Sequence, residues 1–141
     1  MEQKDTAKIV EELNLSPDFK KFYDENKNYM VSESLAELLE KLLAEKGVKK
    51  ADAVRNSDLN EVYAYQIFSG IRVPDRKKLL CLAFGMGLTI DETQRLLKCA
   101  GYPPLYVKIP FDSVVLYGLT KRLNLIRTNE ILYEYGQETL G

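Results

Sequence analysis

Apolar residues recur at intervals of three and four along most of this chain, and polar capping residues and glycines stand at the ends of these runs. The segment from Ser34 to Gly47 shows the pattern most fully. Ser34 and Glu37 match a capping box, five leucines follow on one helical face, and Gly47 stands where the stripe ends. No segment alternates as a half-buried strand does. The sequence therefore predicts an all-α protein.

Further helices are expected on both sides of this segment. Ser16 as N-cap and Pro17 at the first helical position predict a short helix that carries Phe19, Phe22 and Tyr23. Thr89 and Glu92 form a second capping-box pair. The remaining expected helices run from about Lys49 to Asn56, Asn60 to Gly70, Pro74 to Met86, Thr89 to Gly101, Asp112 to Arg122 and Ile126 to Tyr135.

The stretch GYPPLYVKIP, residues 101–110, is predicted to be non-helical, because proline forces extended backbone on the residue before it. It is also too apolar for a free linker, so we expect it to lie pinned along the surface of the domain. The organisation we predict is an N-terminal helical extension over 1–33, a helical domain over 34–101, and over 102–141 this extended segment with a C-terminal helix pair packed on the same domain.

The last two helix pairs resemble one another when the chain is shifted by 35 residues. Thr93 then aligns with Thr128, and Gly101 with Gly136, and two apolar pairs of residues also match: Leu79-Leu80 with Val114-Val115, and Leu96-Leu97 with Ile131-Leu132. Two copies are too few for a solenoid. A duplicated helix pair and a chance similarity between two amphipathic pairs are both compatible with this pattern.

Composition argues against an enzyme. The chain has no histidine, so the usual general base and the commonest zinc ligand are missing. Its two cysteines, Cys81 and Cys99, each lie in a helical apolar pattern and are expected to be buried, reduced thiols. No catalytic residue, metal site or cofactor is assigned.

Location and charge set further bounds. No apolar run has the length of a membrane span and the start lacks a signal-peptide core, so we expect a cytoplasmic protein that does not contact a membrane. The net charge is −1, but residues 49–78 hold seven Lys or Arg against four Asp or Glu and form the only basic segment. This excess is modest support for a nucleic-acid partner.

The basic segment contains VKKADAVRNSDLNEVYAYQIFSGIRVP, from Val48 to Pro74, which resembles the Xre-type, phage-repressor-like helix-turn-helix family. Residues 70–74 match the Gly-x-x-x-Pro loop that follows the recognition helix in that family. Leu59, Ala64 and Ile67 fall where the motif buries apolar side chains. The resemblance covers about 50 residues. It implies a bundle of about five helices, to which this chain adds its N-terminal extension and its C-terminal pair.

Three residues depart from the family pattern. Val54 stands where a small residue is expected within the second helix, and Asp58 stands in place of the usual turn glycine. Aspartate tolerates left-handed backbone better than most residues. Lys50 replaces the glutamine that often begins the second helix, and it can still serve a phosphate electrostatically. None of the three is expected to destroy the fold.

The resemblance implies a DNA-binding transcriptional regulator, a repressor that binds double-stranded DNA as a homodimer and reads the major groove with the helix Asn60–Ser69. It places base contacts at Glu61, Val62, Tyr65 and Gln66. Phosphate contacts are expected at Lys49, Lys50, Asn60, Ser69, Arg72 and Lys77, within a flanking basic set that also contains Arg55, Arg76 and Lys78. Chemically, glutamine suits adenine, glutamate suits a cytosine amino group and valine suits a thymine methyl.

A second interpretation stays open. The pI of about 5.6 and a recognition helix without lysine or arginine favour a non-enzymatic protein-interaction module on the same scaffold. The two tyrosines bear on this choice, since Tyr65 is expected to face the groove, whereas Tyr63 lies on the flank and is expected to pack against the protein.

Overall fold

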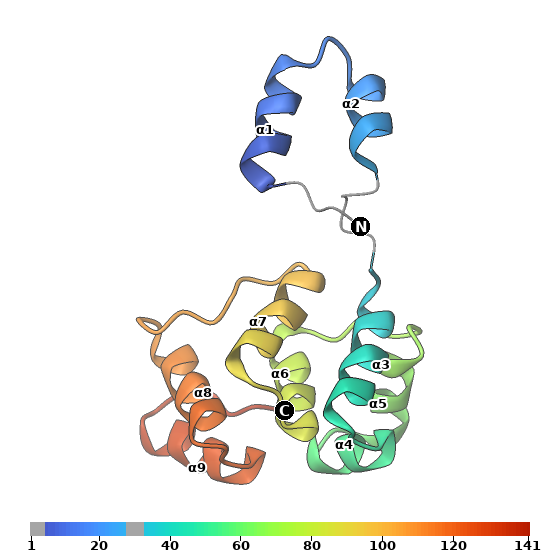
Figure 1. The fold of residues 1–141 in the computed structure, drawn as a ribbon. Coiled ribbons are helices and arrows are strands. Elements are labelled where there is room, and N and C mark those ends of the chain that lie inside the picture. Colours follow the sequence, from blue (N-terminus) through green and yellow to red (C-terminus); the bar gives the residue numbers. More distant parts are fainter. Residues whose placement is uncertain (1–4, 28–32) are drawn as a thin grey trace. The chain divides into compact units, whose positions relative to one another are not determined.

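The computed structural model describes residues 5–27 and 33–141, which form nine α-helices and no β-strand (Figure 1). The prediction of an all-α protein is confirmed for this part of the chain. Parts of the predicted extension over 1–33 lie outside the described residues. The helices are α1 (Thr6–Leu15), α2 (Phe19–Asn26), α3 (Leu35–Lys46), α4 (Lys50–Asn56), α5 (Glu61–Phe68), α6 (Arg76–Met86), α7 (Ile90–Cys99), α8 (Pro110–Thr120) and α9 (Leu125–Glu134).

The chain divides into two compact units, Met1–Ser32 and Glu33–Gly141. The first unit holds α1 and α2, and here the predicted start of the short helix is wrong. The N-cap of α2 is Asp18, whose side chain accepts a 2.7 Å hydrogen bond from the Lys21 N–H. Ser16 instead ends α1, and its hydroxyl donates to the Asp18 carbonyl, so Pro17 lies in the connection between the helices.

The caps of the second unit follow the sequence closely. The Ser34 hydroxyl accepts from the Glu37 N–H, and α3 ends at Gly47, whose φ of 65° is left-handed. Thr89 and Glu92 make both hydrogen bonds of a capping box at the start of α7. Because each cap satisfies backbone groups that the helix itself leaves unpaired, these helix ends are set locally.

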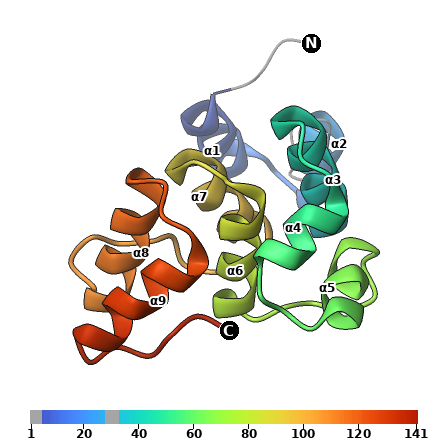
Figure 2. The ribbon, with the colours of Figure 1, turned by 90° about the horizontal axis from the view of Figure 1, so that it is seen from below.

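Helix α6 is the centre of the second unit. In both ribbon views it lies between the α3–α5 group and the α8–α9 pair (Figures 1 and 2). All but one of the residues from Leu79 to Met86 are buried, and burial raises the pKa of the Cys81 thiol to about 12. Cys99 departs from the sequence prediction, since it is only partly buried at the end of α7. No described helix combines the length and hydrophobicity that a membrane crossing requires.

The segment between α7 and α8 runs extended over the surface and is held at several points. The Gln94 side-chain amide donates to the Leu105 carbonyl at 2.9 Å and accepts from its N–H at 2.7 Å. The Tyr102 hydroxyl donates to the Pro74 carbonyl. Pro110, which the sequence placed in this segment, instead occupies the first turn of α8, where a proline without an N–H costs nothing.

The α6–α7 and α8–α9 pairs repeat the same structural devices at an offset of 35 residues. Thr93 and Thr128 are both fully buried, and each hydroxyl donates to the carbonyl four residues earlier. Asn129 binds the Leu140 backbone through two hydrogen bonds, as Gln94 binds that of Leu105. Left-handed backbone also recurs, at Gly87 and Arg122 and at Gly101 and Gly136. Matches at this many specialised positions favour a duplicated unit over chance similarity.

Candidate nucleic-acid interface

The connection from α4 to α5 is a tight turn set by three neighbouring residues. Ser57 is fully buried, and its hydroxyl donates to the Val54 carbonyl at 2.6 Å while accepting from the Leu59 N–H. Asp58 has a φ of 57°, as its place in the turn requires. Asn60 then caps α5 by accepting from the Tyr63 N–H at 3.1 Å. These bonds fix the direction in which α5 leaves the turn.

Helix α5 presents one face to the core and another to solvent. Ala64, Ile67 and Phe68 are buried, as the spacing predicts. On the other face Val62 is 65% exposed and Tyr65 is 36% exposed. Tyr63 is half-buried and packs against the core cluster. The tyrosines therefore point in different directions, as residues two apart on a helix must.

The outward side chains of α5 line one shallow hollow of about 500 Å³. It contains all four of the residues assigned as base contacts and two of those assigned to phosphates. Its lining is Lys50, Glu61, Val62, Tyr65, Gln66 and Ser69. The hollow therefore combines a cation, a carboxylate, an amide, two hydroxyls and an apolar side chain on one side of the molecule.

The cations around this hollow already have partners within the chain. Lys50 forms an ion pair with Glu40, and its ammonium lies 5.6 Å from the centre of the Phe68 ring. The Arg72 Nε–H donates to the Gln66 Oε1 at 2.9 Å, and its guanidinium lies 6.0 Å from the Tyr63 ring centre. Because these contacts are at the surface, each is weak and exchangeable.

The other assigned phosphate contacts are less uniform. Lys77 pairs with Glu138 in the C-terminal tail, and that contact lowers the pKa of the Glu138 carboxyl. Lys49 is exposed at the N-cap of α4. Asn60 and Ser69 bond their own helix, since the Ser69 hydroxyl donates to the Gln66 carbonyl at 3.1 Å. The structure thus gathers Lys50 and Ser69 at the hollow and gives Lys77 a separate partner.

Arg76 has a structural role that the sequence did not reveal. Its guanidinium donates to both carboxylate oxygens of Asp112, at 2.9 and 3.0 Å, and to the carbonyls of Pro103 and Pro104. Asp112 is 1% exposed and also accepts from the Tyr106 N–H. Arg76 therefore fastens the start of α6 to the extended segment and to α8, and it is not available to a phosphate.

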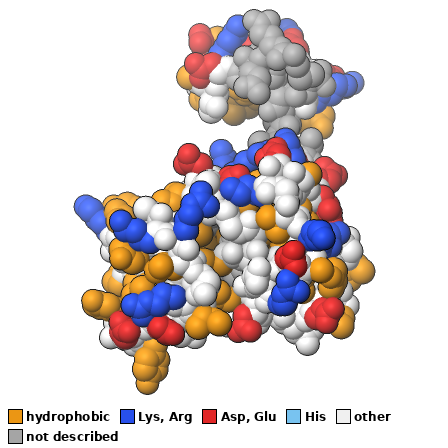
Figure 3. All heavy atoms as spheres, turned by 60° about the horizontal axis from the view of Figure 1, so that its bottom comes forward, with side chains coloured by type: hydrophobic (Ala, Val, Ile, Leu, Met, Phe, Trp, Pro, Cys, Tyr) orange, Lys and Arg blue, Asp and Glu red, His pale blue; other side chains and the backbone are white. Residues whose placement is uncertain are grey.

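One face of the molecule carries mixed charge. On the face drawn in Figure 3, lysine and arginine side chains are interspersed with acidic ones and with apolar areas. Ile71 and Val73, in the loop after α5, are 73% and 78% exposed. The α5 region is therefore partly apolar and only weakly basic.

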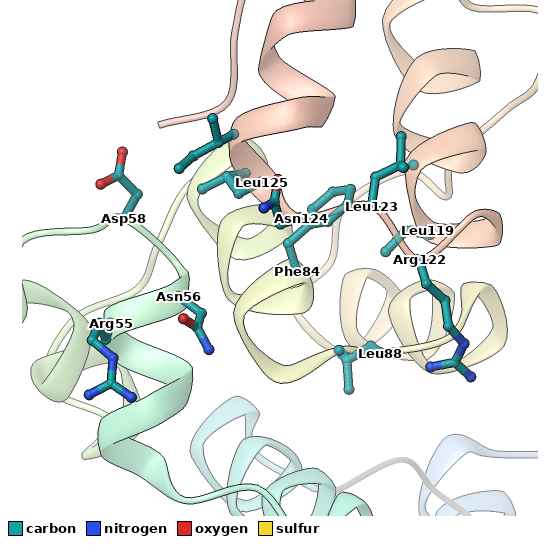
Figure 4. Close-up of a pocket in the computed structure, with 13 residues that line it drawn as sticks. Arg55, Asn56, Asp58, Phe84, Leu88, Leu119, Arg122, Leu123, Asn124 and Leu125 are labelled. Carbon is teal, nitrogen blue, oxygen red and sulfur yellow. The ribbon is translucent and has the colours of Figure 1, made fainter.

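A second hollow, of about 490 Å³, lies where α4, α6 and the α8–α9 connection approach one another (Figure 4). Leu119 and Leu125 supply buried apolar walls, and Phe84 lies among them. Arg55 and Arg122 are on different sides of the hollow, and Arg55 is paired with Asp52. This hollow could not be predicted from the sequence, because its lining comes from three separate segments.

In the described part of the chain, no three His, Cys, Asp or Glu side chains gather as metal ligands do. Comparisons of this chain with protein-family models, with curated proteins and with solved structures find no match.

Proposed function

We propose that this chain is a DNA-binding transcriptional regulator of the Xre-type, phage-repressor-like helix-turn-helix kind, with α5 as the recognition helix. The observation that carries the proposal is the hollow beside α5. Its lining brings together the outward side chains Glu61, Val62, Tyr65 and Gln66 with Lys50 at the start of α4. Hydrogen-bonding groups for base edges thus lie next to a cation at the end of a neighbouring helix, which suits a phosphate.

In this proposal Arg72 and Gln66 exchange partners when DNA binds. In the free protein the Arg72 guanidinium occupies the Gln66 carbonyl oxygen. A phosphate is a stronger acceptor than a neutral amide, so Arg72 would turn to the backbone. Gln66 would then be free to pair with adenine through its carbonyl oxygen and amide N–H. A homodimer would place two such helices about one helical turn of DNA apart, and regulation by repression follows from occupancy of the site.

A protein-interaction module is the second candidate, and the exposed apolar residues favour it. Val62, Ile71 and Val73 are each more than 60% exposed around α5. Tyr65 separates the two candidates. Loss of its hydroxyl in Tyr65→Phe should weaken DNA binding if α5 lies in a groove, and should spare DNA affinity if the surface binds protein.

The test is a polarisation titration of the full chain against labelled genomic fragments at two salt concentrations. Affinity should fall steeply with salt. Lys50→Gln or Arg72→Gln should each reduce the slope of log affinity against log salt concentration by about one unit. Gln66→Ala should weaken the preferred site by roughly 1 to 3 kcal/mol and leave non-specific binding nearly unchanged. Lys98→Gln, an exposed cation on α7, is the matched control and should change neither quantity.

Two results would count against the proposal. Absence of DNA affinity at low salt would leave the protein-interaction module as the better account. An equal loss on all sequences for Gln66→Ala would mean that Gln66 positions the protein without reading a base.

A further inference from the structure

The α6–α7 and α8–α9 pairs pack on each other through matching faces. Helix α6 contacts α9, and α7 contacts α8. Helix α6 corresponds to α8, and α7 corresponds to α9, so interchanging the two pairs turns the α6–α9 contact into the α7–α8 contact. This is the relation expected of two copies packed around an approximate twofold axis. Each pair therefore has an inner face, toward the other pair, and an outer face.

The outer face of the first pair is covered, with α3 packed on α7 and α4 packed on α6. Glu92 on α7 forms a 3.1 Å ion pair with Lys46 near the end of α3. Arg95, one turn along α7, pairs with Glu33 just before α3 at 3.4 Å, and the Cys99 thiol donates to the Glu33 carbonyl. Helix α3 thus runs antiparallel to α7, and its buried leucines face the core.

The corresponding outer face of the second pair is open. It forms a groove of about 450 Å³ lined by Ser113, Val114, Tyr117, Arg127, Ile131, Glu134 and Tyr135. Thirty-five residues earlier, the same positions hold Lys78, Leu79, Leu82, Glu92, Leu96, Cys99 and Ala100. Leu82 is fully buried in the first pair, whereas its counterpart Tyr117 is 51% exposed, and Tyr135 is 72% exposed.

The composition of this groove differs from that of the covered face in a consistent way. Tyrosines replace Leu82 and Ala100. A tyrosine ring tolerates both water and burial, which makes it common in interfaces that form and separate. The groove is therefore suited to a reversible partner, whereas the buried leucines at the equivalent positions of the first pair are suited to a permanent core.

The charges at this face are reversed between the two pairs. Arg127 stands where the first pair has Glu92, and Glu130 stands where it has Arg95. A helix seated as α3 is would need an acidic residue near its C-terminal end to meet Arg127 and a basic residue near its N-terminal end to meet Glu130. In the free chain Arg127 and Glu130 pair with each other at 3.0 Å on the surface, a contact that a partner can replace.

We propose that the α8–α9 groove binds an amphipathic α-helix of another protein, seated as α3 is seated on α7 but with the opposite charges at its ends. The covered face of the first pair is the internal example of the binding mode, and the charge reversal defines the partner. The reversal also excludes the chain's own α3 from a second copy, because Lys46 would meet Arg127 and Glu33 would meet Glu130. This inference does not depend on the DNA-binding proposal.

Two fluorescein-labelled peptides test the proposal against the full chain. One has the sequence of residues 33–47, and the other is the same peptide with Glu33→Lys and Lys46→Glu. The charge-exchanged peptide should bind roughly fivefold more tightly, since like-charge contacts become ion pairs of modest strength. Arg127→Glu should reduce or reverse this preference, and Tyr117→Ala should weaken both peptides. Tyr133→Ala is the control, because Tyr133 is 79% exposed on α9 and does not line the groove.

Several outcomes would overturn the proposal. They are failure of both peptides to bind at millimolar concentration, equal binding of both, or a preference that Arg127→Glu leaves unchanged in a variant whose thermal unfolding matches the parent. The groove could also bind a second copy of this chain, so the oligomeric state of the peptide-free chain is measured by sedimentation. A dimer that Tyr117→Arg dissociates would assign the groove to a second copy of this chain instead.

Discussion

The α6–α7 and α8–α9 pairs share their internal architecture and differ in their outer surroundings. Each has a buried threonine bonded to its own helix and a polar side chain that holds a backbone segment eleven residues later. The first pair is enclosed by α3 and α4 on one side and by the second pair on the other. The second pair keeps one face open. Internal contacts that recur stabilise both pairs, and the surface positions that differ lie on the face where we propose that a partner binds.

The largest effect is expected from the close helix contacts of the two pairs. A Cβ at Gly85 would lie 2.3 Å from the Ala53 carbonyl oxygen, which belongs to rigid helical backbone. Gly85→Ala should lower the free energy of unfolding by roughly 2 to 3 kcal/mol, even though alanine favours the helix itself. At Gly118 the nearest atom is Thr128 Oγ1, at 2.5 Å, and even a buried side chain adjusts more readily than helical backbone, so Gly118→Ala should cost less. Urea denaturation measures both, and a larger loss at Gly118 would contradict this ranking.

Removing either of the polar side chains that bind a distant backbone unit should have intermediate and similar effects on the free energy of unfolding. Gln94→Ala and Asn129→Ala each remove two hydrogen bonds to one backbone unit, so each should cost roughly 1 to 3 kcal/mol. Local hydrogen exchange of backbone amides should differ between the two variants. The segment before α8 keeps its bonds from Arg76, and its amides should therefore remain better protected than those near Leu140. The test is the hydrogen-exchange rate of the Leu105 amide in Gln94→Ala and of the Leu140 amide in Asn129→Ala. Equal exchange rates in the two variants would contradict the expectation.

The smallest expected effect is on the loss of stability at acidic pH. Burial alone would raise the pKa of Glu92, but hydrogen bonds at Thr89 and the contact with Lys46 outweigh it and lower that pKa below its ordinary value of 4.5. The stabilisation is therefore present above this ordinary value and is lost as pH falls through the lower, folded value. Stability should decline less steeply in Glu92→Gln as the pH is lowered from about 5 to 3. Lys98→Gln, which removes an exposed cation of α7 that forms no ion pair with a described carboxylate, should leave the slope unchanged, because lysine itself does not titrate there. An unchanged slope in Glu92→Gln would refute the assignment.

Sequence reasoning succeeded where the signal is local. The ends of α3, α5 and α7 are encoded by capping residues and glycines within a few positions, and the burial of Ala64 and Ile67 follows from spacing. Helix α1 was not located from the sequence, and none of its residues is buried.

Features that join distant segments were beyond such reasoning. The Arg76–Asp112 contact connects residues 36 apart, and Arg76 looked like any other member of the basic set. The contacts of Gln94 and Asn129 with distant backbone could have been predicted, since the 35-residue shift that aligns Thr93 with Thr128 also aligns Gln94 with Asn129 and Leu105 with Leu140. The prediction that α5 faces a DNA groove stays a prediction, although its outward residues line one hollow.

We propose that α5 and the open α8–α9 groove are separate binding surfaces, and that DNA binds at α5. An amide-resolved NMR titration of the labelled full chain with a DNA fragment that it binds tests this most directly. We expect shifts for the amides of Glu61 to Ser69, for the start of α4 and for Ile71 and Arg72, with little change at Tyr117 or Ile131. Shifts confined to α8 and α9, or none at saturating DNA and low salt, would contradict it.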